Sequence, residues 1–249
     1  MENDSKRPSG ASRLIAILDA VALAGGHLRY RDASRVLAPV SPNTVARLLH
    51  ELVTARVLEQ DAKGYHLGDR PIFWAVSASP KNDLRLLARP ALVQLTTSLK
   101  LTSCLIACMD GHMTIVDRIV APTGPLLMPP GQFRPPNGAH IGGPFFMTAA
   151  DLQDPKRWAA SLASATVGTD PEIMRRLTLQ GLTRDFLDDD GLIYRGVRRL
   201  VTPIRRGGRI VACLGLGGRP RRLADPVLRR HAARMLRAAA RQISQQLTN

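Results

Sequence analysis

VSPNTVARLLHELVTARVL, residues 40–58, is the stretch that decides the fold of the N-terminal part of the chain. Ser41 is a candidate N-cap, and Pro42 stands at the first helical position, where its fixed backbone angle is favoured. Apolar side chains then recur at helical spacing, at Val45, Leu48, Leu49 and Leu52. The opposite face begins with short polar side chains and an arginine. Such a helix suits the major groove of DNA, because short donors reach base edges while cations hold phosphates.

Two further helices are expected before this stretch. Residues 12–26, SRLIAILDAVALAGG, carry apolar side chains at helical spacing behind Ser12, a possible cap. Residues 31–38, RDASRVLA, repeat the pattern and stop at Pro39. The polar residues 1–11 before them are expected to form a disordered tail.

A short hairpin is expected after this stretch. Residues 57–60 and 64–67 have the pattern of two strands, and the Asp-Ala-Lys sequence between them has turn chemistry. Three helices followed by a hairpin predict a winged helix-turn-helix over residues 12–70. Lys63 would stand at the tip of the wing, within reach of a phosphate. The candidate DNA-contacting residues are therefore Ser41, Asn43, Thr44, Arg47, His50 and Lys63.

The net charge does not by itself identify the partner. The chain carries 35 Lys and Arg against 20 Asp and Glu, a formal charge of +15, which favours anionic partners. Residues 1–80 hold 10 basic and 8 acidic side chains, whereas residues 81–249 hold 25 and 12. The excess lies outside the N-terminal third, so a solvated arginine-rich surface explains it more simply than a dedicated anion site.

The cysteines and the hydropathy exclude several classes of protein. Three cysteines, Cys104, Cys108 and Cys213, cannot form an even disulfide framework, and no His or Cys lies near them at a metal-ligand spacing, so a cytoplasmic location and no metal site are expected. No cofactor is expected either. The N-terminus has no apolar export segment, and no run approaches 18 apolar residues. Membrane association is therefore not expected.

The C-terminal two thirds have a mixed helix and strand pattern. Residues 102–110 and 113–120 predict a hairpin around Gly111, and residues 200–218 predict another turning at Gly207-Gly208, with one buried sheet face. A long helix closes the chain from Asp225 onward. Antiparallel strands mixed with helices define an α+β class.

The domain boundary is expected near residue 80. Residues 71–78 and 84–99 have helical patterns, and the Ser-Pro-Lys-Asn sequence between them interrupts the chain. The interpretation is a linker helix region over residues 71–83, followed by a separate domain over residues 84–249.

The sequence resembles the IclR-type bacterial transcriptional regulators. The resemblance covers nearly the whole chain and rests on SPNTVARLL (41–49), GYHLG (64–68), PPNGAHIGGPFFMTA (135–149), GVRRLVTPI (196–204) and LGLGGRPRRLAD (214–225). It implies a winged helix-turn-helix joined by a linker helix to a GAF-like effector-binding domain. It also implies a homodimer or tetramer that binds a double-stranded DNA operator under the control of a small-molecule effector.

The resemblance also implies a set of residues around the effector. Its members are Leu127, Met128, Pro135, Ile141, Gly142, Val197, Arg199 and Gly215, with Asp189, or its neighbours Asp185 or Asp188, near the rim. This chain departs from the family pattern where Arg199 replaces a cysteine, Gly215 and Gly217 replace serines and Pro144 replaces a lysine.

Arg199 suggests the chemistry of the effector. An unpaired guanidinium in the cleft would require an anion, which predicts a small carboxylic acid with an apolar or aromatic body. The alternative is that Arg199 forms an ion pair with Asp188, Asp189 or Asp190.

Two other classes of function remain open from the sequence. The first is an enzyme built on the C-terminal domain, but no nucleophile, phosphate-loop or metalloprotease motif is present, and Asp188–Asp190 beside Gly191 have the pattern of a solvated turn. The second is a winged helix that binds protein. The apolar linker residues Ile72, Phe73, Trp74 and Val76 suit a subunit interface, with burial against the C-terminal domain as the alternative.

Overall fold

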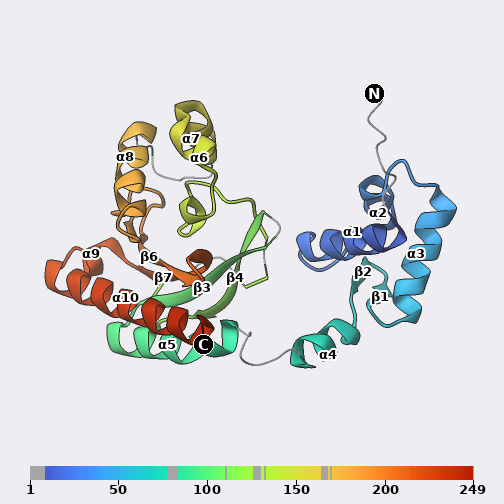
Figure 1. Cartoon of the computed structure of the whole chain (residues 1–249), viewed down its shortest axis with the longest axis horizontal. Helices are drawn as coiled ribbons and strands as arrows, with labels where there is room; N and C mark the ends of the chain where they lie inside the picture. The colour runs from blue at the N-terminus through green and yellow to red at the C-terminus, as the bar shows by residue number, and fades with distance from the viewer. Residues whose placement is uncertain are drawn as a thin grey trace. The chain divides into compact units, whose positions relative to one another are not determined.

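The chain divides into two compact units, residues 1–79 and 80–249. The structure is a computed structural model (Figure 1). The described residues are 9–77, 84–109, 111–125, 130, 131, 133–163, 168 and 170–248.

Unit 1 is a three-helix domain with a two-stranded wing. Its elements are α1 (Gly10–Leu23), α2 (Tyr30–Val36), α3 (Pro42–Thr54), β1 (Leu58–Asp61), β2 (Gly64–Leu67) and α4 (Asp69–Ser77). The apolar stripe predicted for α3 is buried, and it packs with Ile17 and Val21 of α1, Ala33 of α2 and Leu58 of β1. The winged helix-turn-helix expected from the sequence is therefore confirmed.

The start of α1 differs from the prediction. The helix begins at Gly10, so residues 10 and 11 do not belong to a tail, and residues 1–8 lie outside the described part of the chain. Ser9, not Ser12, is the N-cap, because its Oγ accepts a hydrogen bond from the Ser12 backbone N–H at 3.1 Å. The apolar pattern could not locate this first turn, which contributes no buried side chain.

The wing is held to the helices by a third, very short strand segment. Leu28, between α1 and α2, exchanges two backbone hydrogen bonds with Tyr65 of β2, at 2.8 and 2.9 Å. Gly64 makes this approach possible, because a Cβ there would lie 2.6 Å from the Leu28 carbonyl oxygen and the residue has a φ of +138°. The loop after α1 is thereby fixed to the wing.

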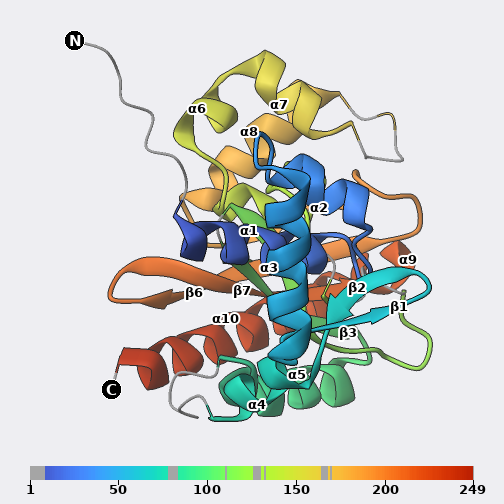
Figure 2. The ribbon, with the colours of Figure 1, turned by 90° about the vertical axis from the view of Figure 1, so that its right-hand side faces the viewer.

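Unit 2 is a five-stranded antiparallel sheet between two layers of helices. The strands are β3 (Thr102–Met109), β4 (His112–Ile119), β5 (Leu187–Asp188), β6 (Arg198–Arg206) and β7 (Arg209–Gly218), in the order β4-β3-β7-β6-β5. The helices are α5 (Leu84–Leu99), α6 (Ala149–Gln153), α7 (Pro155–Ser161), α8 (Pro171–Leu182), α9 (Pro220–Leu223) and α10 (Pro226–Thr248). Figures 1 and 2 agree that α5 and α10 lie on one side of this sheet, and α6, α7 and α8 on the other.

Both faces of the central strands are buried, where the sequence predicted only one. Leu105 and Leu214 pack against α5 and α10, whereas Ile106 and Cys213 belong to a second core with Phe145 on the opposite face. The strands show no clear alternation of apolar and polar residues in the sequence, because small and apolar residues occupy both faces of the sheet. The second face carries the candidate effector site.

Candidate nucleic-acid interface and effector pocket

The exposed face of α3 is polar along its first three turns. Asn43, Arg47 and His50 are exposed, and Thr44 is half-buried at the edge of the core. Lys63 is exposed in the turn between β1 and β2. These are the side chains that the sequence predicts at a nucleic-acid interface.

Two of the predicted contact residues already have local partners. The Ser41 Oγ accepts the Thr44 backbone N–H at 3.4 Å and lies 3.0 Å from the Thr44 hydroxyl, so Ser41 acts as the cap of α3. Arg47 donates to Glu51 one turn later, with Nη1 to Oε1 at 2.8 Å. Because both side chains of this pair are well exposed, it contributes only about 0.3–0.5 kcal/mol, and another acceptor can replace it.

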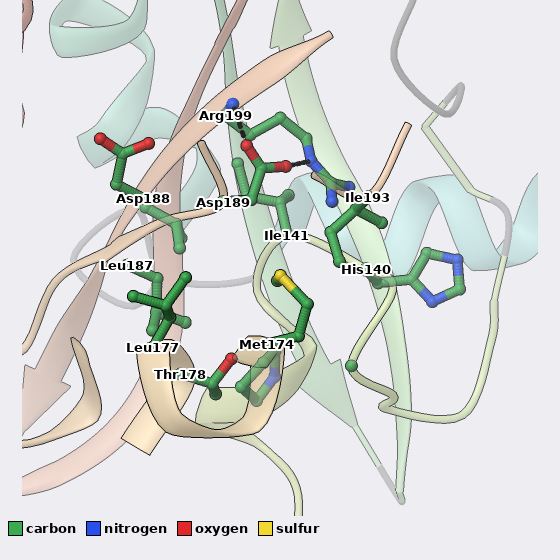
Figure 3. A pocket seen from close by; sticks show the side chains of 13 residues that line it. His140, Ile141, Met174, Leu177, Thr178, Leu187, Asp188, Asp189, Ile193 and Arg199 are labelled. Carbon is green, nitrogen blue, oxygen red and sulfur yellow. Dashed lines mark hydrogen bonds and ion pairs between the residues drawn. The ribbon is translucent and has the colours of Figure 1, made fainter. Parts of the chain in front are cut away.

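A small polar and apolar pocket lies on the second face of the sheet in unit 2 (Figure 3). Its cavity volume is about 30 Å³. The lining residues come from the 3-10 helix Gly143–Phe145 and the loop before it, from α8, from β5 and the turn after it, and from β6. They are Gly138, His140, Ile141, Pro144, Met174, Leu177, Thr178, Leu187, Asp188, Asp189, Ile193, Arg199 and Val201.

Three of the predicted effector residues, Ile141, Asp189 and Arg199, line this pocket. Gly142 and Gly215 are not among the lining residues. A Cβ on Gly215 would be 2.9 Å from the Cys104 Sγ and 3.6 Å from Ile141, which does line the pocket, so the missing side chain lets β7 pack closely against these two residues.

The other predicted effector residues are not brought into the lining. Pro135 is exposed, and Val197 forms a bridge with Tyr194 outside the pocket. Leu127 and Met128 lie outside the described residues.

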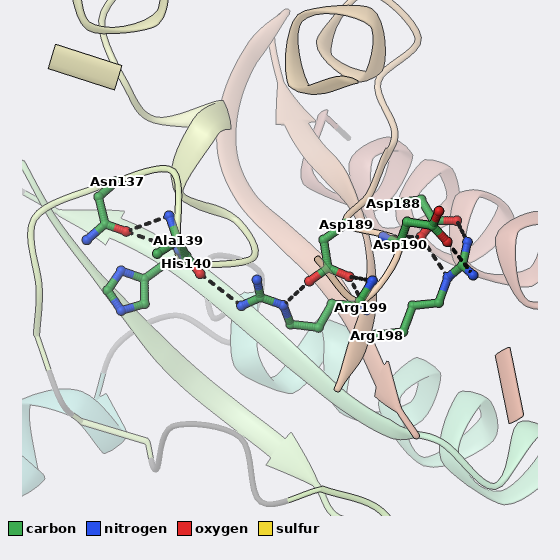
Figure 4. A network of polar contacts seen from close by, with 9 residues as sticks. Asn137, Ala139, His140, Asp188, Asp189, Asp190, Arg198 and Arg199 are labelled. Atoms are coloured by element: carbon green, nitrogen blue, oxygen red, sulfur yellow. Dashed lines mark hydrogen bonds and ion pairs between the residues drawn. The ribbon is translucent and has the colours of Figure 1, made fainter. Parts of the chain in front are cut away.

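Arg199 is paired, which overturns the idea of a free guanidinium in the cleft (Figure 4). Its Nε donates to Asp189 Oδ2 at 2.5 Å, and its Nη1 donates to the Ala139 carbonyl at 3.0 Å. The second oxygen of the same carboxylate accepts the Arg199 backbone N–H at 2.7 Å. The Arg199 side chain is only 6% exposed. The protein therefore neutralises this cation itself, and the charge of Arg199 alone does not require an anionic effector.

The neighbouring acidic residues are also engaged, contrary to the expected solvated turn. Asp188 accepts two hydrogen bonds from Arg198, from Nε at 3.0 Å and from Nη2 at 2.8 Å. The Nη1 of the same guanidinium lies 2.5 Å from the Asp190 Oδ1. Arg198 and Arg199 are adjacent on β6, so their side chains point to opposite faces of the sheet. Arg198 therefore pairs with Asp188 and Asp190, and Arg199 pairs with Asp189. This turn is a fixed wall of the pocket.

Among the residues that line the pocket, His140 has the largest pKa shift. Burial, followed by the nearby cations Arg134 and Arg199, lowers the pKa of His140 to about 4. The ring is therefore neutral at neutral pH. Its Nδ1 is buried without a hydrogen-bond partner among the described residues, which leaves one polar atom for a ligand or a water.

The sequence did not identify the contribution of α8. Met174, Leu177 and Thr178 lie at i, i+3 and i+4 on one face of this helix, and that spacing was available in the sequence. Nothing in the pattern indicated that this face covers the sheet at the pocket. In Figure 3, Met174 lies in the middle of the lining, between the other α8 side chains and Ile141.

Together, the two units define a class: a winged helix-turn-helix followed by an α+β domain with a small pocket on its sheet. A comparison with protein-family models finds no match, and a comparison with curated protein sequences finds none either. Solved structures do match over nearly the full length.

Many of the matching structures are IclR-type transcriptional regulators. A putative regulator from a Silicibacter species superposes with a TM-score of 0.76 at 18% identity, covering 96% of each chain. One from Alicyclobacillus acidocaldarius gives 0.71 at 18% identity, covering 95% of this chain and 98% of that one. An IclR homologue from Microbacterium hydrocarbonoxydans, in complex with 4-hydroxybenzoate, gives 0.69 at 21% identity, covering 96% and 99%. The chain thus has the fold of the IclR-type regulators, as the resemblance predicts.

No helix in the described part of the chain is both long and apolar enough to cross a membrane.

Proposed function

We propose that this chain is a DNA-binding transcriptional regulator whose activity is controlled by a small-molecule effector. The observation that carries the proposal is the exposed polar face of α3, with Asn43, Arg47 and His50, next to a wing that presents Lys63. A helix of this kind fits a major groove, and a wing can contact the flanking phosphates. The fold shared with IclR-type regulators supports the same function.

The enzyme alternative is less well supported by the pocket chemistry. A general base must be free to take a proton, but Asp188 and Asp189 are both ion-paired with arginines. His140, with its pKa near 4, is a weak base. The arrangement is better suited to binding than to proton transfer.

We propose a small carboxylic acid with an aromatic or apolar body as the effector. Ile141, Met174 and Leu177 provide an apolar wall, and Arg199 with His140 provides polar atoms beside it. The homologue from Microbacterium hydrocarbonoxydans in complex with 4-hydroxybenzoate supports this class of ligand.

Binding of such an acid requires the pocket to open. A cavity of about 30 Å³ holds roughly one or two water molecules, far less than an aromatic acid needs. Met174 is the side chain best able to move, because it is long and unbranched. Displacement of Met174 and of α8 would couple occupancy of the pocket to the shape of unit 2.

We propose that the functional assembly is a homodimer or tetramer. A winged helix contacts only a few base pairs, so pairing two copies multiplies specificity. Ile72, Phe73 and Trp74 of α4 are 64%, 68% and 50% exposed, which leaves an apolar surface for a second copy. The side chain of Val76 lies outside the described part of the chain.

DNA binding is tested with the full chain and a matched pair of variants. An operator is first selected from a random duplex library, and affinities are then measured for Arg47→Ala and Glu51→Ala. We expect Arg47→Ala to weaken binding by about 1–3 kcal/mol and to relax the preference at one base pair. Glu51→Ala should bind as well as the wild type or better, because it releases Arg47. If no sequence is enriched, or if both variants bind like the wild type, α3 is not a DNA-contacting helix and the protein-binding alternative gains support.

Effector binding is tested by the shift in unfolding temperature with 4-hydroxybenzoate and with its uncharged amide. We expect the acid to stabilise the full chain and the amide to do so less. Met174→Phe should remove the effect by filling the pocket, whereas Ile173→Phe, on the exposed side of the same helix, should keep it. An equal shift for acid and amide would exclude recognition of the carboxylate.

A further inference from the structure

A cluster of metal-ligating side chains lies on the wing of unit 1, away from the effector pocket. His27, Asp61 and His66 each offer one ligand atom, and these atoms all lie within 4.8 Å of one another. The His27 Nε2 is 3.0 Å from the Asp61 Oδ2. The two imidazole rings have centroids 5.1 Å apart at 66°. One ligand from the loop after α1 and two from the wing hairpin thus lie close together.

The backbone of the wing holds the two histidines side by side. Leu28 and Tyr65 are directly paired by their two backbone hydrogen bonds, so the antiparallel register places His27 opposite His66 on one face of the sheet. Gly64 allows the segment around Leu28 to come this close. The backbone register therefore brings the two histidine residues side by side.

The Asp61 carboxylate is also oriented by the backbone of the wing. Its Oδ1 accepts the backbone N–H groups of Lys63 at 2.8 Å and Gly64 at 3.0 Å, which leaves Oδ2 directed at His27. Two backbone donors on Oδ1 therefore fix the direction of the second carboxylate oxygen.

His66 has a partner that suits a metal ligand. Its Nδ1 lies 3.2 Å from the Leu67 carbonyl oxygen, which can only accept a hydrogen bond, so Nδ1 is the donor. A proton on Nδ1 leaves the Nε2 lone pair free. Metal-bound histidines commonly donate their other ring N–H to a backbone carbonyl in this way.

From this arrangement we propose that His27, Asp61 and His66 form a binding site for a divalent transition-metal ion, with Zn²⁺ as the best fit. Two imidazoles and one carboxylate are a common Zn²⁺ ligand set, and they leave a fourth position for water or another oxygen ligand. Tetrahedral coordination at about 2.0–2.1 Å needs ligand atoms about 3.3 Å apart. The His27 and Asp61 side chains are 35% and 44% exposed, so they have space on the solvent side in which to rotate toward this geometry.

The sequence predicted no metal site, because the three residues have no motif spacing and the cysteines are not involved. The site exists only once the loop after α1 pairs with β2. A bound ion would link this loop to the wing and would change the local charge from that of one carboxylate to a net positive value. The proposal does not depend on the proposed regulatory function.

The test is Zn²⁺ titration of the full chain, without an affinity tag, in competition with a chromophoric chelator. We expect one Zn²⁺ per chain, a rise in the unfolding temperature, and a tetrahedral visible spectrum when Co²⁺ replaces Zn²⁺. His27→Gln, His66→Gln and Asp61→Asn should each weaken binding about tenfold or more. Asp61→Asn is informative because asparagine can keep the turn hydrogen bonds while losing the charged ligand.

His50→Gln is the matched control, since His50 is an exposed histidine of the same unit outside the cluster. It should bind Zn²⁺ like the wild type. If the wild type takes up no Zn²⁺ at micromolar concentration, or if none of the three variants weakens binding, the cluster is only an ion pair beside a histidine and the proposal is wrong.

Discussion

Arg199 is the residue whose role changes most between sequence and structure. It lies on the pocket face of β6 and holds the Asp189 turn and the Ala139 loop together through one guanidinium. Arg199 is buried and Asp189 is largely shielded from solvent, with side-chain exposures of 6% and 12%. A ligand carboxylate could bind this guanidinium only by sharing it with Asp189. The residue is therefore first a structural link between two pocket walls.

The first prediction concerns this link. Arg199→Ala should lower the unfolding free energy of the full chain by about 3–5 kcal/mol, because it leaves the Asp189 carboxylate buried without a counter-charge. Arg175→Ala is the control, since Arg175 pairs with the exposed Glu172 and should cost less than about 1 kcal/mol. Chemical denaturation measures both. If Arg199→Ala and Arg175→Ala lower the unfolding free energy by the same amount, the ion pair of Arg199 with Asp189 does not stabilise the fold as a buried pair would.

His140 gives a prediction on pH. Its pKa is lowered from 6.5 to about 4 in the folded chain, so the folded state favours the neutral ring. The unfolded chain takes up the proton first as the pH falls, and folding stability from this residue is therefore present above pH 6.5 and is lost between about 6.5 and 4. His140→Gln should flatten the pH dependence of the unfolding free energy in this range. Parallel curves for the wild type and the variant would argue that the ring is not held neutral.

At the scale of the element, the wing depends on a close approach of main chains. Gly64→Ala would place a Cβ 2.6 Å from the Leu28 carbonyl oxygen, in a backbone conformation with φ +138°. We expect a loss of about 1–3 kcal/mol in the stability of unit 1, measured by thermal unfolding of the full chain. Gly10→Ala, at the start of α1 with open space around it, should be neutral or stabilising. If Gly64→Ala is equally harmless, the pairing of Leu28 with Tyr65 is not tight.

The elements themselves could be predicted where their signals are local. The bounds of α3 follow from Ser41, Pro42 and the apolar stripe, all within one stretch of sequence. The position of α8 over the sheet could not be predicted, because the face with Met174 looks like any amphipathic helix. The pairing of Arg199 with Asp189 remained one of several alternatives for the same reason: a sequence gives no distances between segments. Signals of secondary structure are local, whereas a pocket is formed by tertiary contacts.

At the scale of the whole molecule, most of the positive charge does not belong to the unit that is proposed to bind DNA. Residues 1–80 have 10 basic and 8 acidic side chains, and the remaining 25 and 12 lie in residues 81–249. DNA affinity should therefore rest on a few placed cations of unit 1 and not on the overall charge of +15.

The last prediction follows from that distribution and uses the salt dependence of DNA binding. The logarithm of the affinity should fall linearly with the logarithm of the salt concentration, with a slope of about 0.9 per neutralised phosphate. Lys63→Ala, at the wing tip, should reduce the slope by about one for each copy that contacts the DNA, while the base preference stays the same. Arg234→Ala removes another exposed cation, from α10 in unit 2, and should leave the slope unchanged. If both variants reduce the slope alike, the diffuse charge of unit 2 takes part in binding, and if the wild-type slope is flat, the exposed face of α3 binds something other than DNA.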